Sequence, residues 1–318
     1  MSNPPPLRDA TPADLPLLYE LFSDSLRFDL FSPALLEEKL FANPRPLDAP
    51  ETGVNATRFG RGERYRVALM EDGRGAIGAV QVVSRPWEGR AWIGLFAVRS
   101  DARRRGVGRS LLESAIAHAV ADGARTIDLL GIPGNYFAPA LDPRYTAALC
   151  LLERLGFERN GDCSNLVADL AQLPAVGKDE QRLAEAGIEI RRATRNDDAI
   201  LDAFFAEHFG AEWRFECELA MRNPVPALHL ALRDRRAIAF SAHSSQNREW
   251  GFFGPMGTAP EARGSGCGRV LLIRCLADLE REGHATAIIP WVGPIGFYGR
   301  HVTCRVERVY WRLRRTLT

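Results

Sequence analysis

The residue types and spacing best suited to chemistry occur twice in this chain. Residues 103–108 read Arg-Arg-Arg-Gly-Val-Gly, and residues 263–268 read Arg-Gly-Ser-Gly-Cys-Gly. Both follow the pattern Arg-x-x-Gly-x-Gly, come after a short apolar run and open an amphipathic helix. Glycines let the backbone curl so that successive N–H groups face one anion, and the helix N-terminus adds partial positive charge. We call these segments the first and second glycine turns, and each is predicted to bind a phosphate group.

The segments around the two turns repeat in the same order. Each half begins with a short strand and a threonine N-cap before an apolar helix, then continues with a hairpin and a strand leading into the turn. After each turn an apolar-faced helix ends at Gly123 or Gly283 and is followed by an apolar strand. The chain is therefore interpreted as a duplication. The matching segments are 7–14 and 190–197, 67–83 and 228–243, 92–98 and 250–257, and 126–130 and 285–289.

Three kinds of phosphate-binding turn compete for this pattern. A Walker A loop requires a lysine after its last glycine, and neither turn has one. A dinucleotide-binding turn requires a third glycine where this chain has Leu111 and Leu271, and a hairpin before the turn fits poorly with a parallel sheet. Both halves resemble the GNAT superfamily of N-acetyltransferases, whose acyl-CoA loop reads Arg/Gln-x-x-Gly-x-Gly/Ala between its fourth strand and third helix.

This resemblance implies an α/β (α+β) fold of two tandem GNAT-like domains, each a mixed, mostly antiparallel twisted sheet flanked by helices. We place the domains at residues 1–172 and 188–318, with a linker at 173–187 that contains proline, glycine and a charged run. The implied cofactor is acetyl-CoA. Its expected contacts are Phe96, Val98, Arg103, Arg104, Arg105, Gly106, Val107, Gly108 and Arg109 in the first half, and Met256, Gly257, Thr258, Arg263, Gly264, Ser265, Gly266, Cys267, Gly268 and Arg269 in the second.

Acetyl transfer from a thioester to an amine needs a base for the amine and an acid for the leaving thiolate. The resembled family often has a tyrosine as this acid, four residues before a Gly-Phe pair that ends the helix after the fifth strand. Tyr298 matches that position in the second half, whereas counting back from Gly156 gives Leu152 in the first half. The second domain is therefore expected to be catalytic, with Tyr298 as the general acid. His243 and Glu249 are candidates for the base, and a water relay is the alternative.

The strand before the second turn is expected to stabilise the oxyanion through a backbone N–H close to Met256. Pro255 precedes it and has no N–H to donate to a strand ladder. A proline at this position predicts that the strand separates locally from its neighbour, which would open the sheet for a thioester.

The acceptor is expected to be a primary amine of a small molecule. Residues 289–298 and 134–139 resemble tandem bacterial acetyltransferases that act on amino sugars such as glucosamine. Trp291 is a candidate for stacking on a sugar ring, and Trp213 lies in a segment expected to shape the acceptor pocket. Two rival functions remain open: an acyl-CoA-binding sensor or scaffold without turnover, and an aminoacyl or longer-acyl transferase on the same fold.

The composition favours an ordinary globular protein. The chain has 318 residues and a formal net charge of +1, so no global field favours nucleic acid or an anionic membrane as a partner. The six cysteines form no C-x-x-C pair and no zinc-like cluster, so no metal is expected and reduced thiols indicate the cytoplasm. No segment is predicted to be a signal peptide or membrane span. A monomer or homodimer is expected.

Overall fold

The computed structural model describes residues 5–42 and 63–317. The chain divides into two compact units: the first comprises Met1–Cys163 and Tyr310–Thr318, and the second comprises Ser164–Val309. Within the described ranges, no helix is both long enough and apolar enough to cross a membrane.

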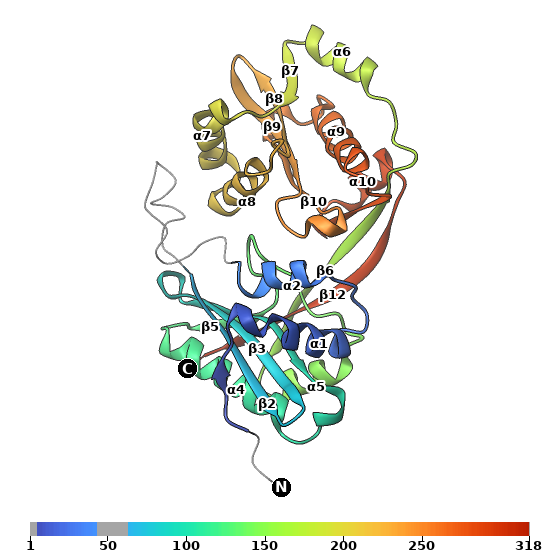
Figure 1. Cartoon of the computed structure of the whole chain (residues 1–318). Helices are drawn as coiled ribbons and strands as arrows, with labels where there is room; N and C mark the ends of the chain where they lie inside the picture. The colour runs from blue at the N-terminus through green and yellow to red at the C-terminus, as the bar shows by residue number, and fades with distance from the viewer. Residues whose placement is uncertain (1–4, 43–62, 318) are drawn as a thin grey trace. The chain divides into compact units, whose positions relative to one another are not determined.

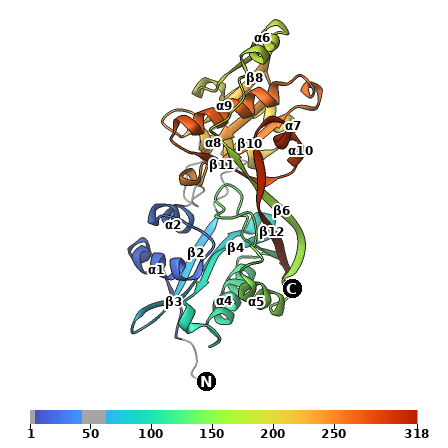
Figure 2. The same cartoon turned by 90° about the vertical axis from the view of Figure 1, so that its right-hand side faces the viewer.

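The first unit is a mixed sheet with helices on both faces. Strands β1 to β4 form an antiparallel series, and β5 joins β4 in parallel. Helices α1 and α2 cover one face of this sheet, and α4 and α5 cover the other (Figure 2). The elements are β1 (Arg8–Asp9), α1 (Leu15–Ser25), α2 (Pro33–Leu40), β2 (Arg64–Asp72), β3 (Gly75–Arg85), β4 (Arg90–Val98), α4 (Val107–Ala121), β5 (Thr126–Leu129) and α5 (Thr146–Arg154).

The second unit repeats this plan. Strands β7 to β10 form an antiparallel sheet, with α7 and α8 on one face and α9 on the other (Figure 1). Its elements are α6 (Gly177–Glu185), β7 (Ile188–Arg192), α7 (Asp198–His208), α8 (Ala211–Met221), β8 (Leu228–Arg233), β9 (Arg236–His243), β10 (Phe253–Thr258), α9 (Cys267–Arg281), β11 (Thr286–Val292) and α10 (Ile295–His301). The predicted fold class is confirmed, because each unit combines a mostly antiparallel sheet with helices on both faces.

Two long strands contribute to both units. β6 (Glu158–Asp169) begins in the first unit, and its later residues pair with β11 of the second. β12 (Cys304–Thr316) begins in the second unit, and its last residues pair with β5 of the first. Each unit therefore has one strand that arrives from the other half of the sequence.

The exchange changes the domain boundaries expected from the sequence. Residues 164–172 lie in the second unit rather than in a domain ending at residue 172, and residues 310–318 lie in the first unit rather than in a domain starting at residue 188. Composition marks a linker only locally, whereas the pairing of residues 314–316 with β5 joins positions almost 190 apart in the chain. The expected linker at 173–187 contains α6, which packs on β7 and α9 of the second unit.

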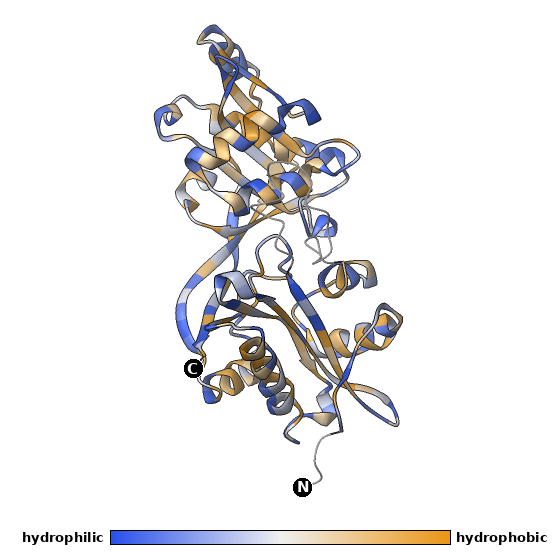
Figure 3. Ribbon diagram, turned by 90° about the vertical axis from the view of Figure 1, so that its left-hand side faces the viewer, coloured by the Kyte–Doolittle hydropathy of each residue, from blue (hydrophilic) through white to orange (hydrophobic). Residues whose placement is uncertain are grey.

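The core of the first unit lies between β2–β5 and the helices α4 and α5. β3 is buried along almost its whole length, and the central strands of this unit are mostly hydrophobic in Figure 3. The C-terminal strand completes this core, because Leu313 and Leu317 pack with Leu111, Ile127 and Leu152. Arg314 also binds Asp128 of β5, with Nε 2.7 Å from Oδ1.

We predict that Leu313→Ala destabilises the first unit, although residue 313 follows the whole second half in sequence. Leu313 is 2% exposed, and loss of a buried leucine costs about 2–5 kcal/mol. Val309→Ala is the control, since Val309 is 43% exposed and lies at the other side of the unit boundary. Hydrogen exchange followed by mass spectrometry reports each unit separately. We expect faster exchange in β5 and α4 with Leu313→Ala and little change with Val309→Ala. Loss of protection only in the second unit would contradict the assignment of Leu313 to the core of the first unit.

Candidate functional site

The two glycine turns have the same backbone conformation. In the first, Arg104 and Gly106 have φ of +63° and +87°, and α4 begins directly afterwards. In the second, Gly264 and Gly266 have φ of +80° and +92°, and α9 begins directly afterwards. Left-handed residues at alternate positions turn intervening N–H groups toward one side, which creates a concave anion site at the helix N-terminus. The sequence pattern therefore predicted the local geometry of both turns.

The first glycine turn is open to solvent. Residues 103–106 are exposed, and a Cβ placed on Gly106 would meet no atom within 4 Å. Arg103 Nε donates to the Val98 carbonyl at 3.1 Å and so bridges the end of β4 and the turn. In the described part of the chain, the N–H groups of residues 104–108 form no recorded hydrogen bond, so they remain available to an anionic ligand.

The second glycine turn is covered by α6. Arg182 Nη1 donates to the Ser265 carbonyl at 2.9 Å, and a Cβ on Gly266 would lie 2.6 Å from Arg182 Nη2. Asp179 forms an ion pair with Arg269 in the first turn of α9. Three backbone donors of this turn are already used. The N–H groups of residues 263 and 265 donate to the carbonyls of residues 260 and 262, and the Cys267 N–H donates to Ser265 Oγ at 3.3 Å. The contacts with α6 place the Arg182 guanidinium beside the second turn.

The sheet of the first unit opens just before the first turn. β4 and β5 pair in parallel only from Arg90 with Thr126 to Ile93 with Leu129. The Leu130 N–H donates to the Ile93 carbonyl at 2.7 Å, and the chain then turns away through left-handed residues at 130 and 131. Gly94–Val98 of β4 continue without β5 beside them. The backbone groups of this segment that point away from β3 therefore face the gap.

A bulge in β4 marks the same place. In the ladder with β3, Val82 is opposite Ile93 and Val80 is opposite Phe96, so two residues of β4 face the single residue Gln81. A bulge re-aims side chains and backbone groups and often accompanies a functional site. Here it lies at the point where β4 and β5 separate.

A small pocket with buried polar side chains lies beside this gap. This pocket is narrow and closely packed. Lys39 Nζ donates to Asn135 Oδ1 at 3.2 Å and is only 1% exposed. Nearby, Arg85 Nε donates to Glu63 Oε1 at 2.5 Å, and both side chains are buried. The lining residues are Lys39, Gln81, Gly94, Leu95, Leu130, Gly131, Ile132, Asn135, Tyr136 and Phe137.

Sequence reasoning missed Lys39, Gln81 and Asn135 because they come from α2, β3 and the loop after β5, with no common spacing. Asn135 and Phe137 lie in the segment 134–139, which resembles amino-sugar acetyltransferases. This resemblance was the sequence signal that pointed to the pocket. Of the predicted residues in the first unit, the structure places Phe96 and Val98 on the free part of β4 and residues 103–109 in the turn that follows.

In the second unit the strand before the turn, β10, also separates from β11, and among the described residues only an isolated bridge between Phe252 and Ile288 joins them. A Cβ on Gly257 would lie 2.6 Å from Phe209 Cζ, so the Phe209 ring packs directly on β10. Trp213 stacks on Phe209 with ring centroids 5.2 Å apart and is 38% exposed. Two residues of β10, Gly254 and Pro255, lie opposite one residue of β9, so the expected irregularity at the proline is present as a bulge. Met256, Gly257 and Thr258 follow it on β10.

Tyr298 and Leu152 occupy equivalent positions, as the sequence count indicated. Each follows a residue packed on the last glycine of its turn: Leu151 lies 3.0 Å from a Cβ built on Gly108, and Phe297 lies 3.6 Å from one built on Gly268. Tyr298 is 6% exposed, packs edge-on against Phe253, and belongs to the same hydrophobic core cluster as buried residues of α9. Burial raises the pKa of Tyr298 well above its usual value, so the phenol stays protonated.

Comparison with known proteins agrees with this geometry. Residues 18–141, which lie wholly in the first unit, match the model of the acetyltransferase (GNAT) family. These residues are therefore similar to the GNAT family of acetyltransferases. The family is one of acyltransferase enzymes, and its fold is present in both units. No curated protein matches the sequence.

Solved GNAT structures resemble the whole chain, including both units. A glucosamine N-acetyltransferase region of a fungal multi-domain GH3 β-N-acetylglucosaminidase is 18% identical with a TM-score of 0.78; the match covers 99% of this chain but only 38% of that longer protein. A GCN5-related N-acetyltransferase from Sphaerobacter thermophilus is 18% identical with a TM-score of 0.68, over 98% of this chain and 95% of that one. A tandem GNAT protein from the clavulanic acid biosynthesis pathway is 16% identical with a TM-score of 0.61, over 98% of each chain. At these identities the likeness shows a shared fold.

The remaining candidates of the second GNAT unit lie apart from Tyr298. Glu249 is exposed in a short 3-10 turn before β10 rather than at the start of the strand, because β10 begins only at Phe253. Trp291 is 40% exposed on β11, where its backbone N–H donates to Asn165 Oδ1 at 3.1 Å. His243 is fully buried at the end of β9. Among the described residues, no recorded hydrogen bond joins any of these groups to Tyr298.

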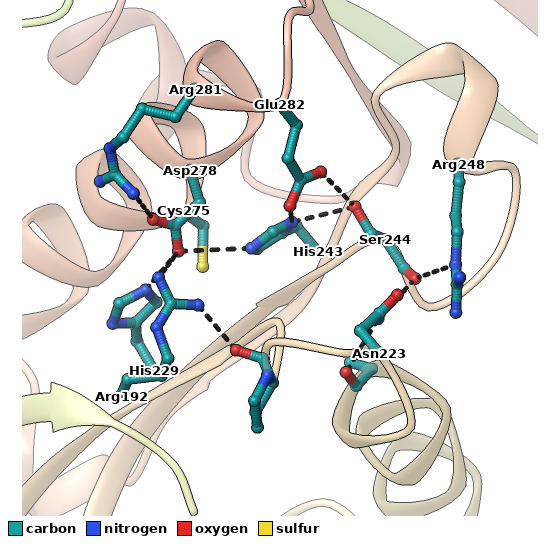
Figure 4. Close-up of polar contacts among 12 residues, drawn as sticks. Arg192, Asn223, His229, His243, Ser244, Arg248, Cys275, Asp278, Arg281 and Glu282 are labelled. Carbon is teal, nitrogen blue, oxygen red and sulfur yellow. Dashed lines mark hydrogen bonds and ion pairs between the residues drawn. The ribbon is translucent and has the colours of Figure 1, made fainter.

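His243 belongs to a buried polar cluster around Asp278 of α9 (Figure 4). Asp278 Oδ2 lies 2.6 Å from His229 Nε2 and 2.6 Å from Arg192 Nη2, and 3.4 Å from His243 Nε2. His243 Nδ1 lies 3.0 Å from Ser244 Oγ, which donates to Glu282 at 3.2 Å. Through Asp278 the cluster joins α9 to β7, β8 and β9, and this position between packed elements favours a structural role for His243.

Two pKa shifts in this cluster make stability depend on pH. Burial lowers the pKa of His229, despite the nearby Asp278 carboxylate. Burial alone would raise the pKa of Asp278, but hydrogen bonds from His229 and His243 and the charge of Arg192 outweigh it and hold that pKa well below its usual range. Both groups therefore bind protons less readily in the folded than in the unfolded chain. Their contribution to stability is complete above the unfolded pKa of His229, near 6.5, and falls as the pH drops.

We predict that the second unit loses stability between pH 7.5 and 5, with a slope of up to about 1.4 kcal/mol per pH unit from His229. His229→Gln keeps a donor toward Asp278 but cannot be protonated, so it should flatten this slope. His118→Gln, which removes a partly exposed histidine of the first unit, is the control. Denaturant unfolding at a series of pH values measures the effect, and equal slopes for the wild type and His229→Gln would contradict this account.

Proposed function

We propose that this chain is an N-acetyltransferase that transfers an acetyl group from acetyl-CoA to a primary amine of a small molecule, and that the first unit performs the reaction. Both units have a gap in the sheet before the turn, and the observation that favours the first unit is its open glycine turn. The second unit has a covered turn and a ring packed on β10. This reverses the expectation that the second unit is catalytic.

The first unit has groups that can bind each part of an extended acyl-CoA. The free N–H groups of residues 104–108 and the N-terminus of α4 face the pyrophosphate, and Arg104 and Arg105 add positive charge. From there the free edge of β4 supplies peptide groups that can hydrogen-bond amides of the pantetheine arm. Phe96 and Val98 lie on that edge, which directs the thioester toward Gly94 and Leu95 in the bulge.

The reaction forms an N–C bond between the acceptor amine and the acetyl carbonyl carbon, and it breaks the C–S bond to release the CoA thiolate. A backbone N–H of the bulge that faces the gap would stabilise the negative charge on the carbonyl oxygen. The amine must lose a proton and the thiolate must gain one, so the net proton transfer is from nitrogen to sulfur. When the substrates fill the gap, they exclude water from it. The neutral form of the amine is then favoured, because burial of an ammonium is costly.

Leu152 cannot supply that proton, so the first unit needs another route. The nearest phenol on the same helix is Tyr145 at its N-cap, whose hydroxyl donates to Asp29 Oδ2 at 2.5 Å and accepts from the Phe28 N–H at 3.1 Å. These bonds tie the segment after α1 to α5, which indicates a positioning role. We therefore infer that water passes the proton from the amine to the thiolate.

We propose an amino sugar as the acceptor class. Two features support it: the likeness, over nearly all of this chain, to a region described as a glucosamine N-acetyltransferase, and a pocket lining that combines Lys39 and Asn135 with Tyr136 and Phe137. Amide and ammonium groups can bind sugar hydroxyls, and aromatic rings can pack on a sugar face. The second unit then has a supporting role, since its β12 completes the sheet of the first.

The glycine turns can be tested one at a time. We predict that Gly106→Glu lowers CoA affinity at least about tenfold, because a carboxylate would face the pyrophosphate, whereas Gly266→Glu changes it less than about twofold. The two variants are matched, since both positions have φ near +90° and start a helix. Calorimetric titration with CoA measures both. If CoA affinity is lost with Gly266→Glu and kept with Gly106→Glu, the CoA site lies in the second unit instead.

A second prediction concerns turnover. Thiol release from acetyl-CoA with a panel of amines that includes glucosamine should be detectable, and Tyr298→Phe should retain at least about half of the rate, because Tyr298 lies outside the proposed site. A large loss of turnover with unchanged CoA affinity would instead support Tyr298 as the general acid. CoA binding with no release for any amine would support an acyl-CoA sensor.

A further inference from the structure

The gap between β4 and β5 has a closed wall on the side of α2. Gln81 is the single residue of β3 that lies opposite the two bulged residues of β4, Gly94 and Leu95. Ile132 follows β5 and approaches the same place from the other side of the gap. A Cβ built on Gly94 would lie 2.0 Å from Gln81 Oε1 and 2.8 Å from Ile132 Cδ1. The two side chains therefore fill the space directly above Gly94.

Gln81 is fixed in this position. Its side chain is 1% exposed, and Nε2 donates to the Lys39 carbonyl at 2.6 Å, near the end of α2. Asn135 Nδ2 approaches the same carbonyl at 3.5 Å, so α2, β3 and the loop after β5 meet at one atom. A side chain held by a buried hydrogen bond cannot swing aside without leaving that donor or acceptor unpaired.

We propose that Gln81, supported by Ile132, sets the length of the acyl group that this enzyme transfers. The inference rests on the proposed function, because it assumes that the thioester enters the gap of the first unit. The acyl carbon chain beyond the carbonyl then points toward Gln81 and Ile132. An acetyl group ends before this wall, whereas each added methylene must displace a packed side chain or break the bond to Lys39.

The second unit shows that the fold does not require glutamine at this position. Its bulge places Gly254 and Pro255 opposite Ala242 of β9, which is the counterpart of Gln81. Ala242 is fully buried in a well-packed core. Alanine is therefore compatible with this strand and bulge, and Gln81→Ala is expected to fold while enlarging the space above Gly94.

The test compares acetyl-CoA, propionyl-CoA and butyryl-CoA with one fixed amine acceptor. In the wild type we expect kcat/KM to fall at least about tenfold for each added methylene. In Gln81→Ala the ratio of butyryl to acetyl transfer should rise at least about tenfold. Gln81→Met keeps the volume of the side chain and should retain the preference for acetyl. Val82→Ala, on the same strand but on the α4 side, is the control for general loosening.

The outcomes distinguish a failure of the role of Gln81 from a failure of the proposed function. Transfer of acetyl by all variants with an unchanged length profile in Gln81→Ala would overturn the role of Gln81 but leave the proposed function intact. Absence of transfer with every acyl-CoA would contradict the proposed function. In that case the affinities of acetyl-CoA and butyryl-CoA, measured without acceptor, still test the wall: equal affinity ratios in the wild type and Gln81→Ala would overturn it. Circular dichroism confirms that each variant is folded.

Discussion

The candidate site of the first unit depends on one constraint: β4 and β5 are hydrogen-bonded to each other at one end and separate at the other. Their parallel pairing from Arg90 to Ile93 fixes the strands in the sheet, and the bulge opposite Gln81 together with the turn after Leu129 ends that pairing. The strand that leaves the gap leads directly into the glycine turn and α4. The place where a thioester can enter and the place where a pyrophosphate can bind are therefore set by the same strand.

The two units show how one backbone plan can lead to different surfaces. Both have a glycine turn with two left-handed residues and a bulge in the preceding strand. They differ in what covers those features. In the second unit α6 places Arg182 and Asp179 on the turn, and Phe209 packs on β10. The same backbone plan therefore carries different side chains around the two turns.

Local patterns in the sequence predicted the duplication, the order of elements and the conformation of both turns, because glycine spacing and hydrophobic periodicity act over a few residues. They also identified Leu152 as the counterpart of Tyr298. They did not predict the pairing of residues 314–316 with β5, which brings distant parts of the chain together. Nor did they indicate that α6 covers the second turn, because the contacts between Arg182 and Ser265 depend on tertiary packing. The assignment of Tyr298 as a general acid relied on residue type and position in the sequence, and it stays a prediction.

The central claim is that one of two similar glycine turns holds the acyl donor. Calorimetric titration of the full-length wild-type chain with acetyl-CoA tests this most directly, because the stoichiometry counts the turns that bind. The account predicts one equivalent per chain, with amide signals or hydrogen-exchange protection changing at residues 103–109 and not at 263–269. Two equivalents per chain, or one equivalent that protects only the second turn, would contradict it.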